Sequence, residues 1–575
     1  MPVKLAFLQQ PGTATAGGAI TPAVRVAIQD VAGNNVTTAT TTIVVGIGRN
    51  AAGGTLGGTV AVSAVNGVAT FSNLSIDKSG TGYTLTASAA GLGGATSGEF
   101  TITAGAAAKL AFTLQPARTT AGVPIPEVQV VIQDAFGNTV TTATNGVTAA
   151  IGNNPGGGAL TGTTTVNAVN GLARFLDLSI DGAGTGYTLT ASAAGLTGAT
   201  SIGFDVRVPL IFTAIATGGS AQGSHTCGVT TDGAVYCWGF NGNGQLGDNS
   251  TGNRYTPTLV QAPAGVTFQR VSAGGQHTCA VTLAGDVYCW GRNEFGRLGD
   301  GTNRDRTTPV RVLAPVGVTF ATVSAGAGHS CGLAAAGGVA YCWGSNAAGQ
   351  LGDGSAPNTV QLTPTLVRAP AGVTFTAVST GFFHSCGLTT SGDVYCWGAN
   401  SFGQLGDNTT IDKPTPVRIL APTGVTFAQM DAGYSHTCAL TPSGNAYCWG
   451  YNGDGELGDN TLATKLVPTA VQAGALQFAL LSAGSYHTCG VATTGFGYCW
   501  GNNANGQVGD NTTVRRLTPA ANAGGLSLSV VAAGLSHSCA IATGANGGVY
   551  CWGYNGQGQL GDGTIAQRIV PTRVQ

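Results

Sequence analysis

Histidine and cysteine are the residues of this 575-residue chain whose spacing points most directly to chemistry. All seven histidines and all fourteen cysteines lie after residue 224. Each histidine opens an H-[ST]-C motif, and ten to twelve residues after that cysteine a second one follows in C-W-G. Such residues can bind zinc, supply a reactive thiolate or form disulfides. The motif returns about every 52 residues, so a single chemical site does not explain it.

The cysteine spacing favours disulfides. A turn falls midway between the two cysteines of each motif, which places them opposite each other across a predicted hairpin and within disulfide reach. Zinc requires four ligands close together, whereas identical ligands in every repeat would be spread around a wide ring. No cofactor or metal is therefore expected. The predicted pairs are Cys227–Cys237, Cys279–Cys289, Cys331–Cys342, Cys386–Cys396, Cys438–Cys448, Cys489–Cys499 and Cys539–Cys551.

The other recurring residues are interpreted as structural, because a catalytic or binding site is seldom repeated seven times. Each repeat has one histidine, one tryptophan expected to pack between repeats, and one aspartate expected to close a turn on backbone N–H groups. For the histidines, pH sensing or metal binding is the alternative, and for the aspartates calcium binding. No G-x-S-x-G, HExxH or P-loop motif occurs and every cysteine has a partner, so we predict a non-enzymatic protein. The aspartates are Asp248, Asp300, Asp353, Asp407, Asp459, Asp510 and Asp562.

The elements that position these residues are seven units of about 50 residues, each with four short strand patterns. This pattern is typical of a seven-bladed β-propeller. The segments HTCAVT, VYCWG and GRLGD of the second unit resemble the RCC1 repeat (regulator of chromosome condensation). The cysteine pair departs from intracellular members of that family, so a nuclear or exchange-factor role is not transferred.

The residues before the propeller form two copies of a different repeat of about 104 residues. KLAF, QDxxGN and GxYTLTAS recur in the same order in both copies. They resemble bacterial Ig-like repeats, which implies β-sandwiches of about 100 residues. Tyr83 and Tyr187 are candidate tyrosine corners, or else ordinary half-buried strand residues. The predicted all-β domains are two Ig-like sandwiches and a seven-bladed RCC1-like propeller, at residues 1–107, 108–208 and 209–575.

Differences between the seven units indicate where a partner would bind. If the four strands of each blade are labelled A to D, the A–B and C–D loops open on one face. Three consecutive A–B loops carry aromatic residues, which suit protein or sugar contacts, although packing into the channel wall is an alternative. Six C–D loops carry cations, interpreted as a basic rim for an anionic or carbohydrate-rich partner, or else as solubilising charges. The candidate residues are Phe382, Phe383, Tyr434, Tyr486, Arg254, Arg304, Arg306, Lys413, Lys465, Arg515, Arg516 and Arg568.

Composition limits the function classes. The chain has 94 glycines, 8% charged residues and a net charge of −1, which fits an all-β protein and gives no electrostatic reason to expect nucleic-acid binding. No signal peptide or membrane span is recognised. Paired cysteines indicate an oxidising compartment, and we expect a secreted or cell-surface bacterial protein. The predicted function is binding or adhesion, with a protein or glycan partner. A self-assembling subunit of an extracellular fibre or surface layer, and a secreted enzyme inhibitor, are the alternatives.

Overall fold

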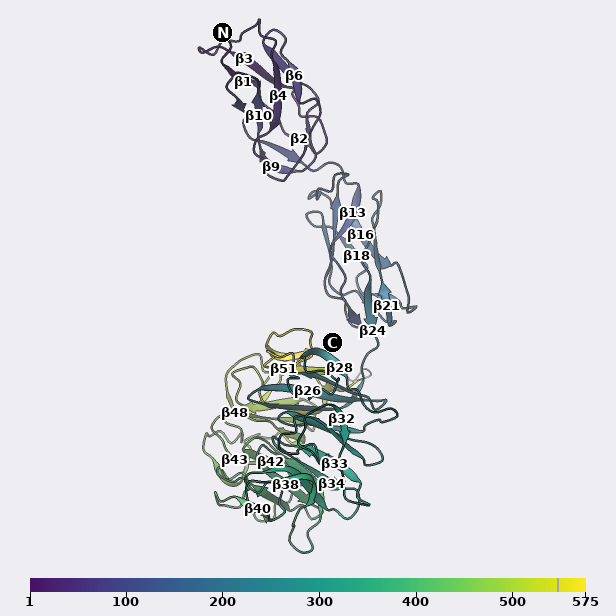
Figure 1. Cartoon of the computed structure of the whole chain (residues 1–575), viewed down its shortest axis with the longest axis vertical. Coiled ribbons are helices and arrows are strands. Elements are labelled where there is room, and N and C mark those ends of the chain that lie inside the picture. Colours follow the sequence, from purple (N-terminus) through teal and green to yellow (C-terminus); the bar gives the residue numbers. More distant parts are fainter. Residues whose placement is uncertain (545–547) are drawn as a thin grey trace. The chain divides into compact units, whose positions relative to one another are not determined.

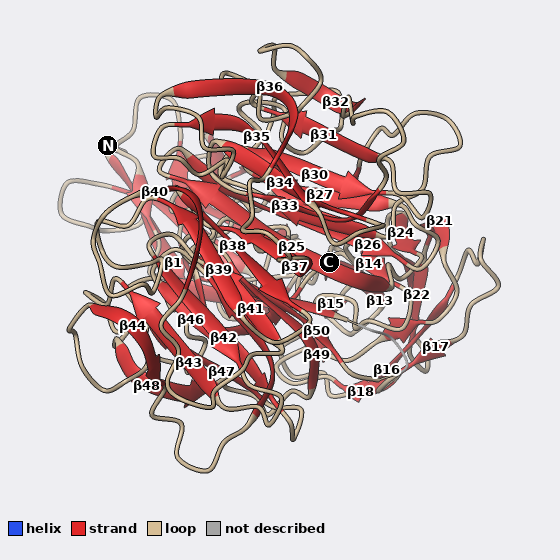
Figure 2. Ribbon diagram, turned by 90° about the horizontal axis from the view of Figure 1, so that it is seen from below, coloured by secondary structure: helices blue, strands red, loops and turns tan. Residues whose placement is uncertain are grey.

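The structure is a computed structural model that describes residues 1–544 and 548–575. It divides into two units, Met1–Pro209 and Leu210–Gln575, which are described separately (Figure 1). Both consist of strands and loops, and no helix occurs among the described residues (Figure 2). The all-β prediction is therefore confirmed.

The second unit contains seven four-stranded antiparallel sheets, each built from four consecutive strands. We number them blades one to seven in chain order and label the strands of each blade A to D. The strands are β25 (Phe212–Ser220), β26 (Gly223–Thr230), β27 (Val235–Gly239), β28 (Arg254–Leu259); β29 (Arg270–Ala273), β30 (His277–Val281), β31 (Val287–Gly291), β32 (Arg306–Arg311); β33 (Phe320–Ala325), β34 (His329–Ala334), β35 (Ala340–Asn346), β36 (Thr359–Leu366); β37 (Phe375–Thr380), β38 (His384–Thr389), β39 (Val394–Gly398), β40 (Lys413–Arg418); β41 (Gln429–Ala432), β42 (His436–Leu440), β43 (Ala446–Gly450), β44 (Lys465–Ala470); β45 (Phe478–Ala483), β46 (His487–Ala492), β47 (Gly497–Gly501), β48 (Arg516–Ala521); β49 (Leu528–Ala533), β50 (His537–Ala542), β51 (Val549–Gly553), β52 (Arg568–Arg573).

The cores of the second unit lie between successive blades. Strands B and C are buried on both faces, since each blade is covered by its two neighbours. Trp290 of blade two is fully buried in a cluster with Leu246 and Phe268 and donates Nε1–H to Gln245 O at 2.9 Å. The same bond recurs for five further tryptophans. The tryptophans thus pack between blades, as expected.

The histidines connect each blade to the next. His225 Nε2 lies 2.9 Å from Thr278 Oγ1, whose hydroxyl donates to Gln245 O at 2.8 Å. Because the hydroxyl proton is used on the carbonyl, Nε2 carries the ring proton and donates it. Equivalent bonds join every pair of neighbouring blades, and His537 of blade seven returns to Thr226 of blade one at 2.9 Å. The seven histidines therefore form a closed ring of contacts between blades.

The seven predicted cysteine pairs are the seven disulfides of the structure, and each joins strands B and C of one blade. Cys438 and Cys448 are directly opposite in the register of β42 and β43, with Cα atoms 4.1 Å apart. All fourteen sulfurs belong to fully buried residues.

The glycine of C-W-G is required by close packing. Gly450 has φ of 101°, and a Cβ at this position would lie 2.5 Å from Ser435 O. Any other residue would be strained by its backbone conformation and would collide with the A–B loop.

The first unit contains two successive copies of the same arrangement of small sheets. In the first copy the sheets are β1-β3-β7, β11-β10-β4-β6, β2-β12-β9 and β5-β8, and in the second β13-β15-β19, β18-β16-β22-β23, β14-β24-β21 and β17-β20. The strands are β1 (Lys4–Gln9), β2 (Ala14–Thr15), β3 (Val24–Gln29), β4 (Thr42–Ile47), β5 (Leu56–Gly57), β6 (Ala61–Ser63), β7 (Val68–Phe71), β8 (Ser75–Ile76), β9 (Gly80–Tyr83), β10 (Leu85–Ser88), β11 (Ala95–Thr96), β12 (Phe100–Thr103); β13 (Lys109–Leu114), β14 (Thr119–Thr120), β15 (Val128–Gln133), β16 (Gly146–Ile151), β17 (Leu160–Thr161), β18 (Thr165–Asn167), β19 (Leu172–Phe175), β20 (Ser179–Ile180), β21 (Gly184–Tyr187), β22 (Leu189–Ser192), β23 (Ala199–Thr200) and β24 (Phe204–Arg207).

Each copy in the first unit has its own apolar core. Tyr83 and Tyr187 are fully buried, and each donates its hydroxyl to a backbone carbonyl five residues earlier, Lys78 O at 3.0 Å and Gly182 O at 2.9 Å.

Candidate functional site

The candidate site is the end of the second unit where the A–B and C–D loops meet. Because the strands of each blade are antiparallel and follow one another in order, these two loops lie at the same end of every sheet. The B–C turns lie at the opposite end. The C–D loops, such as residues 451–464 between β43 and β44, are the longest loops of each blade.

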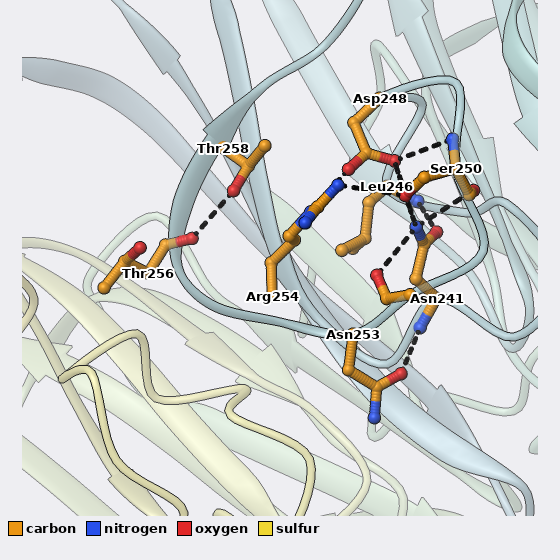
Figure 3. Close-up of polar contacts among 9 residues, drawn as sticks. Asn241, Leu246, Asp248, Ser250, Asn253, Arg254, Thr256 and Thr258 are labelled. Carbon is orange, nitrogen blue, oxygen red and sulfur yellow. Dashed lines mark hydrogen bonds and ion pairs between the residues drawn. The ribbon is translucent and has the colours of Figure 1, made fainter.

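A buried asparagine organises each C–D loop. In blade one, Asn241 donates Nδ2–H to Asp248 and to the carbonyls of Ser250 and Gly252, while its Oδ1 accepts the backbone N–H of Leu246 at 2.9 Å. Figure 3 shows this network around the loop. One side chain thus satisfies several buried backbone groups that no strand pairing reaches.

The recurring aspartate completes the network and holds the cation of the loop. Asp248 Oδ1 accepts from Ser250 N at 3.2 Å, and its Oδ2 accepts Arg254 Nε–H at 2.6 Å (Figure 3). Burial by itself raises the pKa of Asp248, but hydrogen bonds from Ser250 and Arg254 outweigh it, and this pKa lies below its ordinary value. The aspartate therefore closes the turn, as expected, and also makes an ion pair.

This arrangement changes the interpretation of the predicted basic rim. Six of the eight candidate cations are the first residues of D strands and not loop residues, and each pairs with the aspartate of the preceding C–D loop, which compensates its charge. In blade three Gln361 takes the place of the cation and donates to Asp353 at 3.4 Å. The cation recurs because a buried carboxylate needs a partner. The pairs are Arg254–Asp248, Arg306–Asp300, Lys413–Asp407, Lys465–Asp459, Arg516–Asp510 and Arg568–Asp562.

The two remaining cations differ from these six. Arg515 donates to Gly453 O at 3.0 Å and pairs with Asp454 at 3.4 Å, which joins the C–D loops of blades six and five. Arg304 is exposed and has no ion pair within residues 1–544 and 548–575.

The four predicted aromatic residues come together as one ladder over blades four to six. Phe382 packs edge-on against Phe383, with ring centroids 4.6 Å apart. The rings of Phe382 and Tyr434 are tilted relative to each other, with centroids 4.0 Å apart. Tyr434 in turn stacks on Tyr486 at 5.7 Å. Phe383 is 40% exposed and the other three are partly buried. We call Phe383, Phe382, Tyr434 and Tyr486 the aromatic ladder.

The A strands of the seven blades line a central cavity of about 540 Å³, and Phe382 and Tyr434 lie at its A–B end. The sequence analysis missed Asp431, a carboxyl group in this lining. It accepts hydrogen bonds from Ser379 Oγ of blade four at 2.8 Å and from Ala483 N of blade six at 2.9 Å. Burial raises the pKa of Asp431, and these hydrogen bonds oppose that rise.

Glu456 is a second carboxyl group that the sequence analysis missed. It is fully buried, and Oε1 has no hydrogen-bond partner among the described atoms. Burial raises its pKa to about 7. The sequence does signal both residues, since Glu456 stands where five other blades have glutamine and Asp431 where four have serine.

Neither a metal cluster nor a membrane-spanning helix is found in the described part of the chain. No group of three or more His, Cys, Asp or Glu side chains there is arranged to hold a metal ion. No helix of sufficient length and apolarity to cross a bilayer is present in those residues.

Comparison with known proteins identifies the family of the second unit. The profile of the regulator of chromosome condensation (RCC1) repeat matches residues 232–281, 284–333, 337–388, 391–440, 443–491, 495–541 and 546–575. The chain belongs to the RCC1 repeat family. The RCC1-like prediction is thus confirmed, and the fold of this family is the β-propeller, here with a disulfide in each of the seven sheets of the second unit.

Two curated relatives illustrate the RCC1 match. Ultraviolet-B receptor UVR8 of Arabidopsis thaliana is 31% identical over 358 residues, which cover 62% of this chain and 81% of the receptor. The E3 ubiquitin-protein ligase HERC2 of Homo sapiens is 34% identical over 346 residues, which cover 58% of this chain but only 7% of HERC2.

Two solved structures share the propeller fold. Prp20p, the RCC1 of Saccharomyces cerevisiae, superposes with a TM-score of 0.53 at 24% identity and covers 59% of this chain and 85% of its own. Human WBSCR16 superposes with a TM-score of 0.54 at 21% identity, covering 60% of this chain and 91% of its own. At these identities the likeness concerns the fold.

Proposed function

We propose that this RCC1-family chain is a non-enzymatic extracellular binding or adhesion protein, and that the aromatic ladder is its contact site for a protein partner. The ladder carries this proposal. Four aromatic side chains contributed by three consecutive blades form one continuous cluster at the mouth of the cavity. Rigid aromatic side chains that are partly exposed are typical anchors of protein interfaces.

The family supports a protein partner. Yeast RCC1 has been solved bound to Kap60, and Prp20p has been studied for binding to Gsp1p and histones. The seven disulfides support an oxidising, extracellular setting, although the relatives named above are eukaryotic, so they do not support the predicted bacterial origin. An anionic glycan fits this face less well than a protein, because the cations that would bind it are already paired.

We further propose that residues 1–107 and 108–208 are Ig-like sandwiches and that residues 209–575 form a seven-bladed propeller. Tyr83 and Tyr187 support the Ig-like sandwiches. Each is buried and donates its hydroxyl to a carbonyl five residues upstream, which is the geometry of a tyrosine corner. The ring of histidine contacts, which returns from blade seven to blade one, supports the propeller.

The binding proposal is tested by selecting peptides from a random displayed library on the full-length protein. Their affinities are then measured for wild type, Tyr434→Ala and Phe496→Ala. Ala327 occupies the position of Tyr434 in blade three, so Tyr434→Ala suits the fold. Phe496 is a matched control, because it is 45% exposed and lies in a B–C turn at the opposite end of blade six.

We expect Tyr434→Ala to weaken binding by roughly tenfold or more, as for an interface anchor, and Phe496→Ala to leave it unchanged. Selected peptides that bind Tyr434→Ala as tightly as wild type would refute the ladder as the contact site. Self-association of the wild-type chain at micromolar concentration in size-exclusion chromatography would favour the fibre subunit instead.

A further inference from the structure

The position opposite the first cysteine of each blade distinguishes blade five from the others. Along the A strands, the residue paired with this cysteine is serine in four blades and alanine in two. In blade five it is Asp431, paired with Cys438. Tyr434 follows Asp431 by three residues, and Phe382 follows Ser379, which donates to Asp431, by the same interval. The acidic group therefore lies below the aromatic ladder and in the same blades.

Asp431 sets the charge of the cavity near the ladder. Of the residues that line the cavity, Asp431 and Arg270 are the two with charged side chains. Arg270 is exposed at the far end of its A strand, two cross-strand pairs below the serine of blade two. The half of the cavity that opens at the ladder thus contains a carboxyl group without a cation to balance it among the described residues.

Glu456 adds a second acidic group beside the ladder. Its backbone carbonyl accepts hydrogen bonds from Thr488 Oγ1 at 2.8 Å and Trp500 Nε1 at 2.9 Å, so it packs against blade six close to Tyr486. In blade two the equivalent residue, Arg297, reaches Ala327 O in the A–B loop of the next blade at 2.7 Å. The Glu456 carboxyl differs from this arginine: its Oε2 accepts the backbone N–H of Asp454 at 2.9 Å, as the glutamines do in their own loops, and its Oε1 is left without a partner among the described atoms.

The cations near these two acids are already engaged. Lys465 pairs with Asp459 at 3.2 Å and Arg515 with Asp454 at 3.4 Å. Neither Asp431 nor Glu456 has an ion pair in the described part of the chain. The ladder thus lies beside two carboxyl groups that have no cationic partner. Burial raises the pKa of both, and a cation on the ladder would interact with the rings and favour the ionised form of these carboxyl groups.

We propose that the aromatic ladder, with Asp431 and Glu456, binds the cationic side chain of an arginine or lysine presented by the protein partner. This inference rests on the proposed binding role of the ladder and specifies the chemistry of the partner. The cations at the C–D loops predict an anionic partner from sequence alone, whereas this inference gives the partner a cationic group. The cationic group of the partner contacts the rings of the ladder, and the two carboxyl groups stabilise its charge from the protein side.

The test uses the blocked pentapeptide Gly-Gly-Arg-Gly-Gly and the same peptide with citrulline, a neutral isostere of arginine. Binding to the full-length protein is followed by saturation-transfer NMR, which detects millimolar affinities. We expect the arginine peptide to bind roughly tenfold more tightly than the citrulline peptide, in the range of cation–π and charge contributions. Equal binding of the two peptides, or no binding of the arginine peptide, overturns the proposal.

Two substitutions that restore the residues of sister blades test the acids without disturbing the fold. Asp431→Ser copies four other blades, and Glu456→Gln copies five. We expect the double variant to lose the preference for arginine over citrulline. Glu294→Gln, which removes a charge from the C–D loop of blade two on the same face, is the matched control and should keep the preference.

The outcomes separate this inference from the proposed function. If the double variant keeps the full preference for arginine, the role of the two acids is overturned. If the library-selected peptides lose affinity for Tyr434→Ala but contain no arginine or lysine, the ladder stands as a contact site and the cationic partner is overturned. If the affinity of those peptides is the same for wild type and Tyr434→Ala, the proposed function is overturned, and this inference is overturned with it.

Discussion

At the scale of single residues, the asparagine two positions after C-W-G organises each C–D loop through several hydrogen bonds of its side chain. Asn400 is fully buried, donates to Asp407 Oδ1, Thr409 O and Ile411 O, and accepts the N–H of Leu405. It holds the whole C–D loop of blade four in place. The equivalents are Asn241, Asn293, Asn346, Asn452, Asn503 and Asn555.

Asn400→Ala should lower the free energy of unfolding by about 2–4 kcal/mol, because it leaves the buried N–H of Leu405 and the carbonyls of Thr409 and Ile411 without their side-chain partner. Urea unfolding followed by circular dichroism measures the effect. Asn445→Ala is the control, since Asn445 is exposed in a B–C turn. Similar stabilities of the two variants would contradict the role assigned to the buried asparagine.

At the scale of the blade, the central hairpin of strands B and C carries the disulfide. Cys438 and Cys448 close a short loop, with a sequence separation of 10, and both are fully buried. The neighbouring hydrogen-bonded ladder already holds these strands in register. The disulfide therefore adds stability chiefly by limiting the unfolded chain.

Replacing both Cys438 and Cys448 by alanine should cost about 3 kcal/mol, the entropic value for a loop of this length. Chemical denaturation of the double variant checks this value. Wild type in dithiothreitol should keep its disulfides unreduced below the thermal transition, because the sulfurs belong to fully buried residues. Rapid reduction of the native protein would show that the blades open far more readily than this packing implies.

At the scale of the whole second unit, the histidine ring links stability to pH. Burial lowers the pKa of His225 and His436 to about 4 and of His329, His384, His487 and His537 to about 3, and it also lowers that of His277. Each ring is neutral in the folded protein and donates Nε2–H to the next blade. Protonation at Nδ1 would place a charge in a dry interior without a partner.

The sign of the pH effect follows from these pKa values. Below the ordinary histidine pKa of about 6.5, the unfolded chain binds protons that the folded chain does not, so stability falls as pH falls. Glu456 acts in the opposite direction, because its pKa is raised to about 7, and so does Asp431. Seven histidines outweigh these two carboxyl groups.

We therefore expect the melting temperature of the second unit to fall by roughly 10 °C or more between pH 7 and pH 5. Differential scanning calorimetry of the full-length protein measures this change. The first unit has no histidine, so a transition belonging to it should stay nearly constant over the same range. A melting temperature of the second unit that is flat from pH 7 to pH 5 would contradict the buried, neutral ring.

Periodicity in the sequence was sufficient to predict what every repeat shares. A residue type that recurs about every 52 positions must occupy equivalent places in equivalent sheets, so the strand pattern, the cysteine pairs and the inter-blade tryptophans followed from spacing. The aromatic ladder was also predicted as a contiguous patch, because Phe382, Tyr434 and Tyr486 stand in consecutive A–B loops.

The tertiary structure alone decided which charges are free. Arg254 and Asp248 are six residues apart, and only the folded loop shows that the aspartate is buried and claims the arginine. Asp431 and Glu456 differ from their equivalents in the other blades, and this difference is visible in the sequence. Their surroundings and their position beside the ladder depend on contacts with blades four and six. Charge on a side chain is visible in a sequence, whereas the partner that compensates it is a property of three-dimensional neighbours, and for this reason the partner that we propose is cationic and not anionic.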